Sequence, residues 1–88
     1  MSIEREKLVK IFKALGNERR FLIIKHLSGK KELTVNQISE LIHLSFKSVS
    51  KHLLILKNAG LVDYKASNLN KIYFLRKKDA AKEFVRFF

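Results

Sequence analysis

The chain contains no cysteine and no proline, and only three of its 88 residues are glycine. Without cysteine it can form no disulfide bond, no thiolate metal site and no covalent cysteine intermediate. Linkers and disordered tails are usually rich in proline or glycine, so we expect a chain that is ordered nearly from end to end. Disulfide scaffolds and cysteine-dependent enzymes are therefore excluded.

Long apolar runs are also absent. A membrane-spanning helix needs about 20 consecutive apolar residues, and the chain does not open with the charged, apolar and small-residue order of a secretion signal. We expect a soluble, cytoplasmic protein with no membrane partner. The length suits a single domain, residues 1–88, and is too short for a two-domain enzyme with a deep cleft.

Acidic residues are scarce: 8 Asp and Glu stand against 19 Lys and Arg, which gives a formal net charge of +11 and a pI near 10.2. Such a surface attracts polyanions, because neutralising their phosphates releases condensed counterions. A pI above about 9 is typical of nucleic-acid-binding domains. Nucleic acid is therefore the first partner to consider.

Apolar residues at helical spacing predict two N-terminal helices. In residues 3–15 they follow the i, i+3, i+4, i+7 spacing of one helix face: Leu8, Ile11, Phe12 and Leu15. Gly16 ends this helix and Asn17 can cap the next. The second helix is apolar almost all round, so its body is expected in the core: Phe21, Leu22, Ile23, Ile24 and Leu27.

Two further helices, separated by a turn of about three residues, are expected within residues 34–58. Thr34 and Gln37 have the spacing of a capping box that begins the third helix. Ser45 caps the fourth helix, and Gly60 is placed to take the left-handed conformation that closes it. The inner stripe of the fourth helix is Val49, His52, Leu53 and Leu56. The opposite face is polar and basic: Lys47, Ser48, Ser50, Lys51 and Asn58.

Residues 61–66 and 71–75 are rich in Val, Tyr, Ile and Phe around a polar tip, which predicts a β-hairpin. A last helix is expected from about Asp79. The fold class is thus mainly α with a small β-hairpin, in the order helix-helix-helix-helix-hairpin-helix. This is the order of a winged helix-turn-helix domain.

Two stretches resemble the arsenic-repressor-like (ArsR) family of bacterial and archaeal regulators. The first is LGNERR at residues 15–20, followed by Ile23, Ile24 and Leu27. The second is SVSKHL at residues 48–53, followed by Leu56 and NAGLV at residues 58–62, and it is similar to the family's recognition helix and the start of its wing. The resemblance covers roughly residues 8–76. It implies a homodimer, joined through the first and last helices, that represses transcription from an operator with two-fold symmetry.

The N-terminal residues of a recognition helix touch base edges in the major groove, while other groups fix its register on phosphates. Here these residues are Phe46, Lys47, Ser48, Ser50 and Lys51. Lys donates to guanine O6 and N7 and Ser bonds to several bases, so we predict Lys47, Ser48 and Lys51 to read bases and Ser50 to contact a phosphate. A solvated polar helix face is the alternative.

The hairpin would lie against the DNA backbone or the minor groove through Lys65, Asn68, Asn70 and Lys71. Lys65 and Lys71 flank the tip and would supply positive charge there. An Asn-rich tip is also good turn chemistry without any contact to DNA, and the sequence leaves both possibilities open.

Apolar residues of the first and last predicted helices exceed what so small a core can absorb at its edges. We therefore predict a dimer interface formed by Leu8, Ile11, Phe12, Phe84, Val85 and Phe88. The alternative, that these residues close the core of the monomer, stays open at this point.

The ligands of the family's metal sensors are missing. The family's metal sensors carry cysteines in the third helix, where this chain has Val35, Asn36 and Gln37, or His and acidic ligands in the last helix, where this chain has only Asp79 and Glu83. We expect Asp79 and Glu83 to be a solvated i, i+4 pair. Neither a metal site nor a cofactor is expected.

The three histidines also predict no catalytic or metal site. His52 is expected to be a hydrogen-bonded residue at the core boundary. His26 and His43 lie on separate elements without an acidic or sulfur partner at ligand spacing. The chain has no activated nucleophile, no paired acid and base and no glycine-rich phosphate loop, so we expect that it is not an enzyme.

The sequence therefore predicts a dimeric repressor that places two recognition helices in successive major grooves of a palindromic double-stranded operator, about 34 to 36 Å apart. The alternative is a winged-helix module that binds protein or structured RNA, in which the charge serves only solubility. The sequence identifies neither the operator nor a small-molecule effector.

Overall fold

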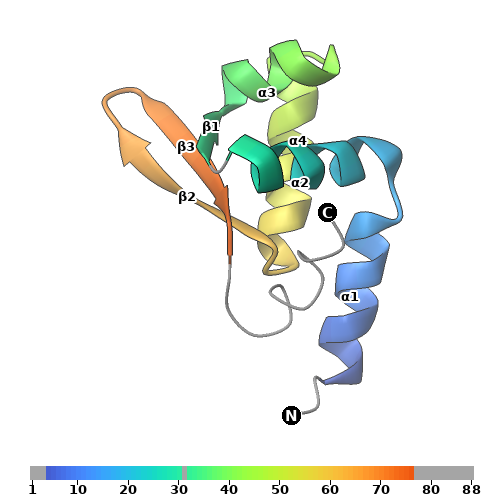
Figure 1. The fold of residues 1–88 in the computed structure, drawn as a ribbon. Coiled ribbons are helices and arrows are strands. Elements are labelled where there is room, and N and C mark those ends of the chain that lie inside the picture. The colour runs from blue at the N-terminus through green and yellow to red at the C-terminus, as the bar shows by residue number, and fades with distance from the viewer. Residues whose placement is uncertain (1–3, 31, 77–88) are drawn as a thin grey trace.

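The structure, a computed structural model, describes residues 4–30 and 32–76. They form helices packed against a three-stranded antiparallel sheet. The elements in chain order are α1 (Arg5–Leu15), α2 (Glu18–Lys30), β1 (Glu32–Thr34), α3 (Val35–Ile42), α4 (Phe46–Asn58), β2 (Val62–Ser67) and β3 (Asn70–Leu75) (Figure 1). The helix predicted from Asp79 lies outside the described residues. Within the described ranges, no helix is both long and apolar enough to span a lipid bilayer.

The predicted capping residues begin α2 and α3. Asn17 Oδ1 accepts a hydrogen bond from the Arg20 amide at 3.1 Å. Thr34 Oγ1 accepts from the Gln37 amide at 3.2 Å, and Gln37 Oε1 accepts from the Thr34 amide at 2.8 Å, so the predicted capping box is confirmed. These bonds satisfy amides that the start of a helix leaves without an intrahelical partner. Gly60 follows α4 with a φ of 78°, the left-handed conformation expected of it.

The sheet has β3 at its centre, between β1 and β2. β2 and β3 form the predicted hairpin, in which Ser67 pairs with Asn70, so the turn consists of Asn68 and Leu69. Asn68 has a φ of 56°, a conformation that asparagine tolerates better than most residues. The tip of the hairpin projects away from the helices (Figure 1).

Strand β1 is absent from the sequence-based prediction. It has three residues and pairs antiparallel with β3, with Leu33 opposite Tyr73. A strand this short displays no alternating pattern, and its residues also fit the approach to α3, so no local signal reveals it. Because β1 runs directly into α3, the hairpin is joined by hydrogen bonds to the segment that begins the helix-turn-helix.

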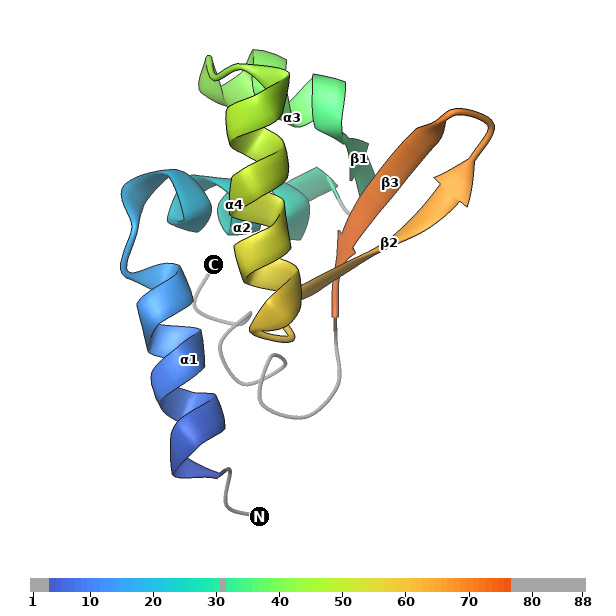
Figure 2. The ribbon, with the colours of Figure 1, turned by 180° about the vertical axis from the view of Figure 1, so that it is seen from behind.

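The core draws buried side chains from each of the described helices and strands. Val49, Leu53 and Leu56 of α4 are all 0% exposed, which confirms the apolar part of the predicted inner stripe. With this face buried, α4 lies on the surface of the molecule along its length, beside the hairpin (Figure 2).

The expectation that the body of α2 lies in the core is confirmed for Ile23, Ile24 and Leu27 but wrong for Phe21, and Leu22 is only partly buried. The three buried residues share one face of the helix, whereas Phe21 is 42% exposed. The core of this small domain lies on only one side of α2, so the remaining face of the helix borders the surface.

Two adjacent leucines of α4 provide a test of this packing. Leu53 is 0% exposed and Leu54 is 57% exposed. We expect Leu53→Ala to lower the free energy of unfolding by about 2–5 kcal/mol, because it removes buried methyl groups and leaves a cavity. Leu54→Ala should change it by about 0.5 kcal/mol or less. Urea unfolding followed by circular dichroism measures both, and equal losses would contradict the placement of α4.

Candidate nucleic-acid interface

The turn between α3 and α4 holds the two helices of the helix-turn-helix together. His43 ends α3 in a left-handed conformation, with a φ of 56°. Ser39 is bonded twice to Leu44: its hydroxyl donates to the Leu44 carbonyl, and its carbonyl accepts from the Leu44 amide at 3.2 Å. Ser45 then caps α4, its Oγ accepting from the Ser48 amide at 3.1 Å. The direction in which α4 leaves α3 is therefore fixed by local bonds.

The first two turns of α4 present the polar residues that the sequence predicts to meet DNA. Phe46 is 56% exposed and Lys47 and Lys51 are exposed, whereas Ser48 and Ser50 are partly buried. Further along, the helix exposes apolar side chains as well as Asn58. Leu54 is 57% and Ile55 43% exposed. The residues predicted to meet base edges thus lie in the N-terminal half of α4, the half that enters the major groove in helix-turn-helix proteins.

The predicted hairpin residues are all exposed, but its lysines already have partners in the protein. Lys65 Nζ lies 3.0 Å from Glu32 Oε2 in an ion pair whose side chains are 56% and 50% exposed. Lys71 Nζ lies 4.8 Å from the centre of the Tyr64 ring. Exposed pairs contribute only about 0–1 kcal/mol, so a phosphate can compete for these cations. Asn68 and Asn70 border the turn.

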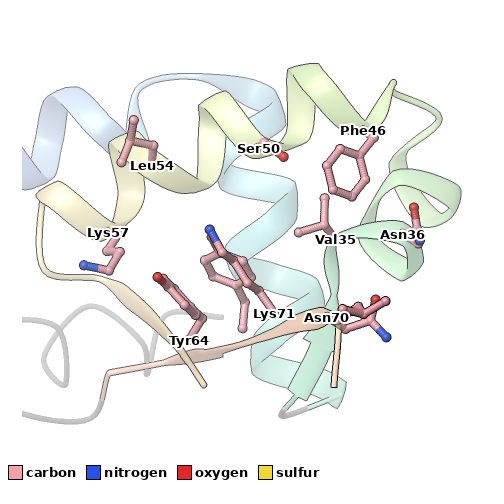
Figure 3. Close-up of a pocket in the computed structure, with 11 residues that line it drawn as sticks. Val35, Asn36, Phe46, Ser50, Leu54, Lys57, Tyr64, Asn70 and Lys71 are labelled. Carbon is pink, nitrogen blue, oxygen red and sulfur yellow. The ribbon is translucent and has the colours of Figure 1, made fainter. Parts of the chain in front are cut away.

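A groove separates α4 from the hairpin and encloses about 420 Å³ (Figure 3). It brings together Phe46 and Ser50 from α4 with Asn70 and Lys71 from β3, four of the predicted contact residues. The remaining lining residues were not predicted as functional: Val35, Asn36, Leu54, Lys57, Tyr64, Leu69 and Tyr73. We name this space, with these lining residues, the α4–hairpin groove.

One of the lining residues that the sequence analysis did not predict could have been identified from helical spacing. Lys57 stands seven residues after Ser50, which is two helical turns along the same face of α4. Tyr64 and Lys71 are diagonal neighbours on one face of the hairpin, whereas the approach of Lys57 to Tyr64 depends on how the hairpin packs against α4, which no local pattern reveals. The Nζ atoms of these lysines lie 5.9 Å and 4.8 Å from the centre of the Tyr64 ring.

Arg20 joins α4 to the first two helices. Its Nε donates to the Ala14 carbonyl at 2.7 Å, and Nη2 donates to the Lys13 carbonyl at 3.5 Å. Its Nη1 lies 3.2 Å from Nδ1 of His52. Burial lowers the pKa of His52, and the positive charges of Arg20 and then Arg19 lower it further. A neutral imidazole can accept the Arg20 bond at Nδ1, so the prediction of a hydrogen-bonded histidine at the core boundary is confirmed.

The other predicted site residues lie apart from this interface. On α1, Phe12 is 56% exposed, Leu8 is partly buried and Ile11 is only 3% exposed, so Ile11 packs in the core and offers almost no surface to a second chain. Val9, 45% exposed, is an apolar residue of α1 that the prediction omitted. The remaining predicted interface residues lie outside the described part of the chain: Phe84, Val85 and Phe88.

Metal ligands do not gather in the part of the chain that the structure describes. No group of three or more His, Cys, Asp or Glu side chains is placed there to hold an ion. Asp79 and Glu83 lie beyond the described residues. The side chains that are described can position cations and hydrogen-bond donors.

The helix-turn-helix followed by the hairpin defines a winged helix-turn-helix protein, and solved structures agree. The fold matches HlyU from Vibrio cholerae N16961 with a TM-score of 0.84 and 31% sequence identity, covering 97% of this chain and 92% of that one. It also matches a homodimeric winged helix-turn-helix DNA-binding domain (fragment 1–100) from Mycobacterium bovis, a possible ArsR-family transcriptional regulator. That TM-score is 0.80, with 26% identity and coverage of 93% of this chain and 71% of the other.

Sequence comparison gives the family. The model of the bacterial regulatory proteins of the arsR family matches residues 17–64. An uncharacterized HTH-type transcriptional regulator of Methanocaldococcus jannaschii is 32% identical over 81 residues, which cover 92% of this chain and 90% of the relative. The chain therefore belongs to the ArsR family, as the sequence motifs indicated, and is a transcriptional regulator with a DNA-binding fold and not an enzyme.

The Arg20–His52 bond predicts a pH dependence of stability. The pKa of His52 is lowered in the folded protein from its ordinary value of 6.5, so the unfolded chain binds the proton more tightly. Stability is therefore fully present above about pH 6.5 and falls as the pH drops through and below that value. His52→Asn keeps a hydrogen-bond acceptor but does not titrate, so we expect it to lack this pH-dependent contribution to stability.

The measurement is urea unfolding of both proteins from pH 7.5 to pH 5. The stability advantage of the wild type over His52→Asn should shrink on acidification. Other titrating groups are common to both proteins and cancel in the difference. Parallel stability curves for the two proteins would show that His52 is not held neutral by its surroundings.

Proposed function

We propose that this protein is a homodimeric repressor that binds a palindromic double-stranded DNA operator through the N-terminal half of α4. The observation that carries the proposal is the pair of exposed lysines, Lys47 and Lys51, on a helix whose opposite face is completely buried. A helix anchored in this way fixes the backbone positions from which the two lysine side chains extend. α4 contains no acidic residue that would repel phosphate or compete for these lysines.

Within this proposal the predicted contacts keep separate roles. Lys47, Ser48 and Lys51 read base edges, since they lie on the part of the helix that can enter the major groove. Ser50, partly buried and facing the groove, contacts a phosphate. Lys65, Asn68, Asn70 and Lys71 bring the hairpin against the backbone or minor groove, and exchange of Glu32 for phosphate frees Lys65 for this contact.

Dimerisation would use α1 and the C-terminal segment. Phe12 and Val9 expose apolar surface on α1, and the predicted C-terminal stripe of Phe84, Val85 and Phe88 would complete the interface. The structurally similar Mycobacterium bovis domain is described as homodimeric. Two-fold symmetry would place two copies of α4 about 34 to 36 Å apart, in successive major grooves. With no cysteine in the chain, the regulator would work without a thiolate metal site.

The test begins with selection of genomic DNA fragments that the protein retains at moderate salt. We expect enrichment of a palindromic site, and the logarithm of its binding constant should fall linearly with the logarithm of salt concentration. Lys51→Ala should weaken binding to this site by about 1–3 kcal/mol while lowering sequence preference at the base pair it contacts. Fluorescence anisotropy of a labelled duplex measures both effects.

Lys25→Ala is the matched control, because it removes the same charge from an exposed position on α2, opposite the buried face of that helix. It should reduce affinity slightly and equally for all duplexes. Equal effects of the two variants would remove α4 as the reading helix. Absence of any preferred fragment would favour a module that binds protein or structured RNA.

A further inference from the structure

The α4–hairpin groove has the size of a small-molecule site. Its volume of about 420 Å³ falls within the range of roughly 300–1,000 Å³ that is usual for ligand pockets. α4 forms one wall, the hairpin the other, and the start of α3 closes one end (Figure 3). A molecule bound here would touch elements that are distant in the sequence and fixed by the common core.

The walls of the groove combine apolar and polar side chains: six of the eleven lining residues are Val, Leu, Phe or Tyr, and the other five are Asn, Ser or Lys. Phe46, Leu54 and Leu69 are 56%, 57% and 102% exposed, and all three border the groove. The rings of Tyr64 and Tyr73, whose centres lie 5.3 Å apart, line the hairpin side. Phe46 and Leu54 leave exposed apolar surface beside the groove that a flat, apolar ring could cover, whereas Leu69 projects into solvent at the hairpin turn.

The charge of the groove is entirely positive among the residues that the structure describes. The amino groups of Lys57 and Lys71 both lie near the Tyr64 ring, one from α4 and one from β3. No Asp or Glu belongs to the lining. Ser50 and Asn70 add hydrogen-bonding groups from the two walls. An occupant should therefore combine an apolar body with a negative charge placed between the two lysines.

We propose that the α4–hairpin groove binds a small aromatic organic anion, and that the bound anion excludes operator DNA. The aromatic part would lie between Phe46, Leu54 and the tyrosine rings, and its carboxylate or sulfonate would contact Lys57 and Lys71. The second half of this inference rests on the proposed function. Phe46, Ser50, Asn70 and Lys71 belong both to the groove and to the predicted DNA contacts, so anion and DNA require the same side chains.

Exclusion of this kind needs no conformational change. When two ligands compete for one surface, the apparent dissociation constant for DNA rises by the factor 1 + [L]/Kd, where L is the anion and Kd its own constant. A concentration of ten times Kd would therefore weaken operator binding about 11-fold. The anion would act as an inducer.

The probe is 8-anilinonaphthalene-1-sulfonate, an aromatic anion whose fluorescence rises in an apolar site. Titrated against the full chain without DNA, it should bind one molecule per protomer. Leu54→Gln removes apolar surface and Lys57→Gln removes one cation, and each should weaken binding at least about fivefold. Both residues border the groove without entering the core, so these variants should fold, which circular dichroism checks.

Controls distinguish the groove from other apolar surface. Leu41→Gln changes a leucine on α3 that is 39% exposed and does not line the groove, and Lys25→Gln changes an exposed lysine on α2. Neither should alter the affinity for the probe. The uncharged relative N-phenyl-1-naphthylamine should bind more weakly than the anion, and Lys57→Gln should leave its affinity unchanged.

Competition completes the test: the anion should displace the protein from its operator with the factor given above, while the uncharged relative at the same concentration should not. Equal probe affinities for Leu54→Gln and Leu41→Gln would overturn the site. Probe binding in the groove without loss of operator affinity would overturn the exclusion.

A loss of DNA affinity in Lys57→Gln without any probe binding would assign the groove to backbone phosphates alone. Failure of the proposed function would appear separately, as absence of operator binding before any probe is added.

Discussion

The burial of one face of α4 is the constraint on which the other features depend. Val49, Leu53 and Leu56 have no exposed surface, so the helix cannot rotate about its axis without breaking the core. That single restriction decides which residues meet solvent, and it turns Lys47 and Lys51 outward. It also sets the face of Phe46 and Ser50 against the hairpin. Recognition surface and groove are thus two results of the same packing.

Hydrogen bonds at its N-terminus and along its side also orient α4. The Ser39–Leu44 bonds and the Ser45 cap set the path of the chain between α3 and α4. Arg20 connects two carbonyls at the end of α1 to His52 on α4. Arg20 is partly buried, and a charged donor that satisfies several acceptors contributes more than a neutral hydrogen bond. The recognition helix is therefore held from its N-terminal end and along its side.

Much of the fold could be predicted from the sequence because helix caps and apolar stripes depend on residues only a few positions apart. The capping residues Asn17, Thr34 and Ser45, and the closing Gly60, act within three or four residues of where they stand, so a sequence alone reveals them. The apolar stripe of α4 is equally local, since helical periodicity places its members on one face. For the same reason the periodicity of α4 is enough to identify Lys47 and Lys51 as presented residues.

The features that the sequence did not predict depend on contacts between segments that are distant in the chain. Strand β1 exists because Leu33 meets Tyr73 across the sheet, a pairing of residues 40 positions apart. The groove also depends on contacts between α4 and the hairpin, such as that of Lys57 with the Tyr64 ring, which no periodicity encodes. Burial also depends on the finished core: Phe21 and Ile11 belong to similar apolar stripes, yet the first borders solvent and the second is enclosed.

Strand β1 has one more consequence, for the mechanical relation between the hairpin and α4. Because β1 bonds to β3 and continues without a break into α3, the distance between the hairpin and the recognition helix is set by a short, stiff path and not by a flexible loop. In the proposed complex, a duplex held by both elements would have to fit that spacing, so any deformation would fall on the DNA. Sequences whose groove width already suits the protein would bind with less elastic cost, and the operator would be selected partly at base pairs that no side chain touches.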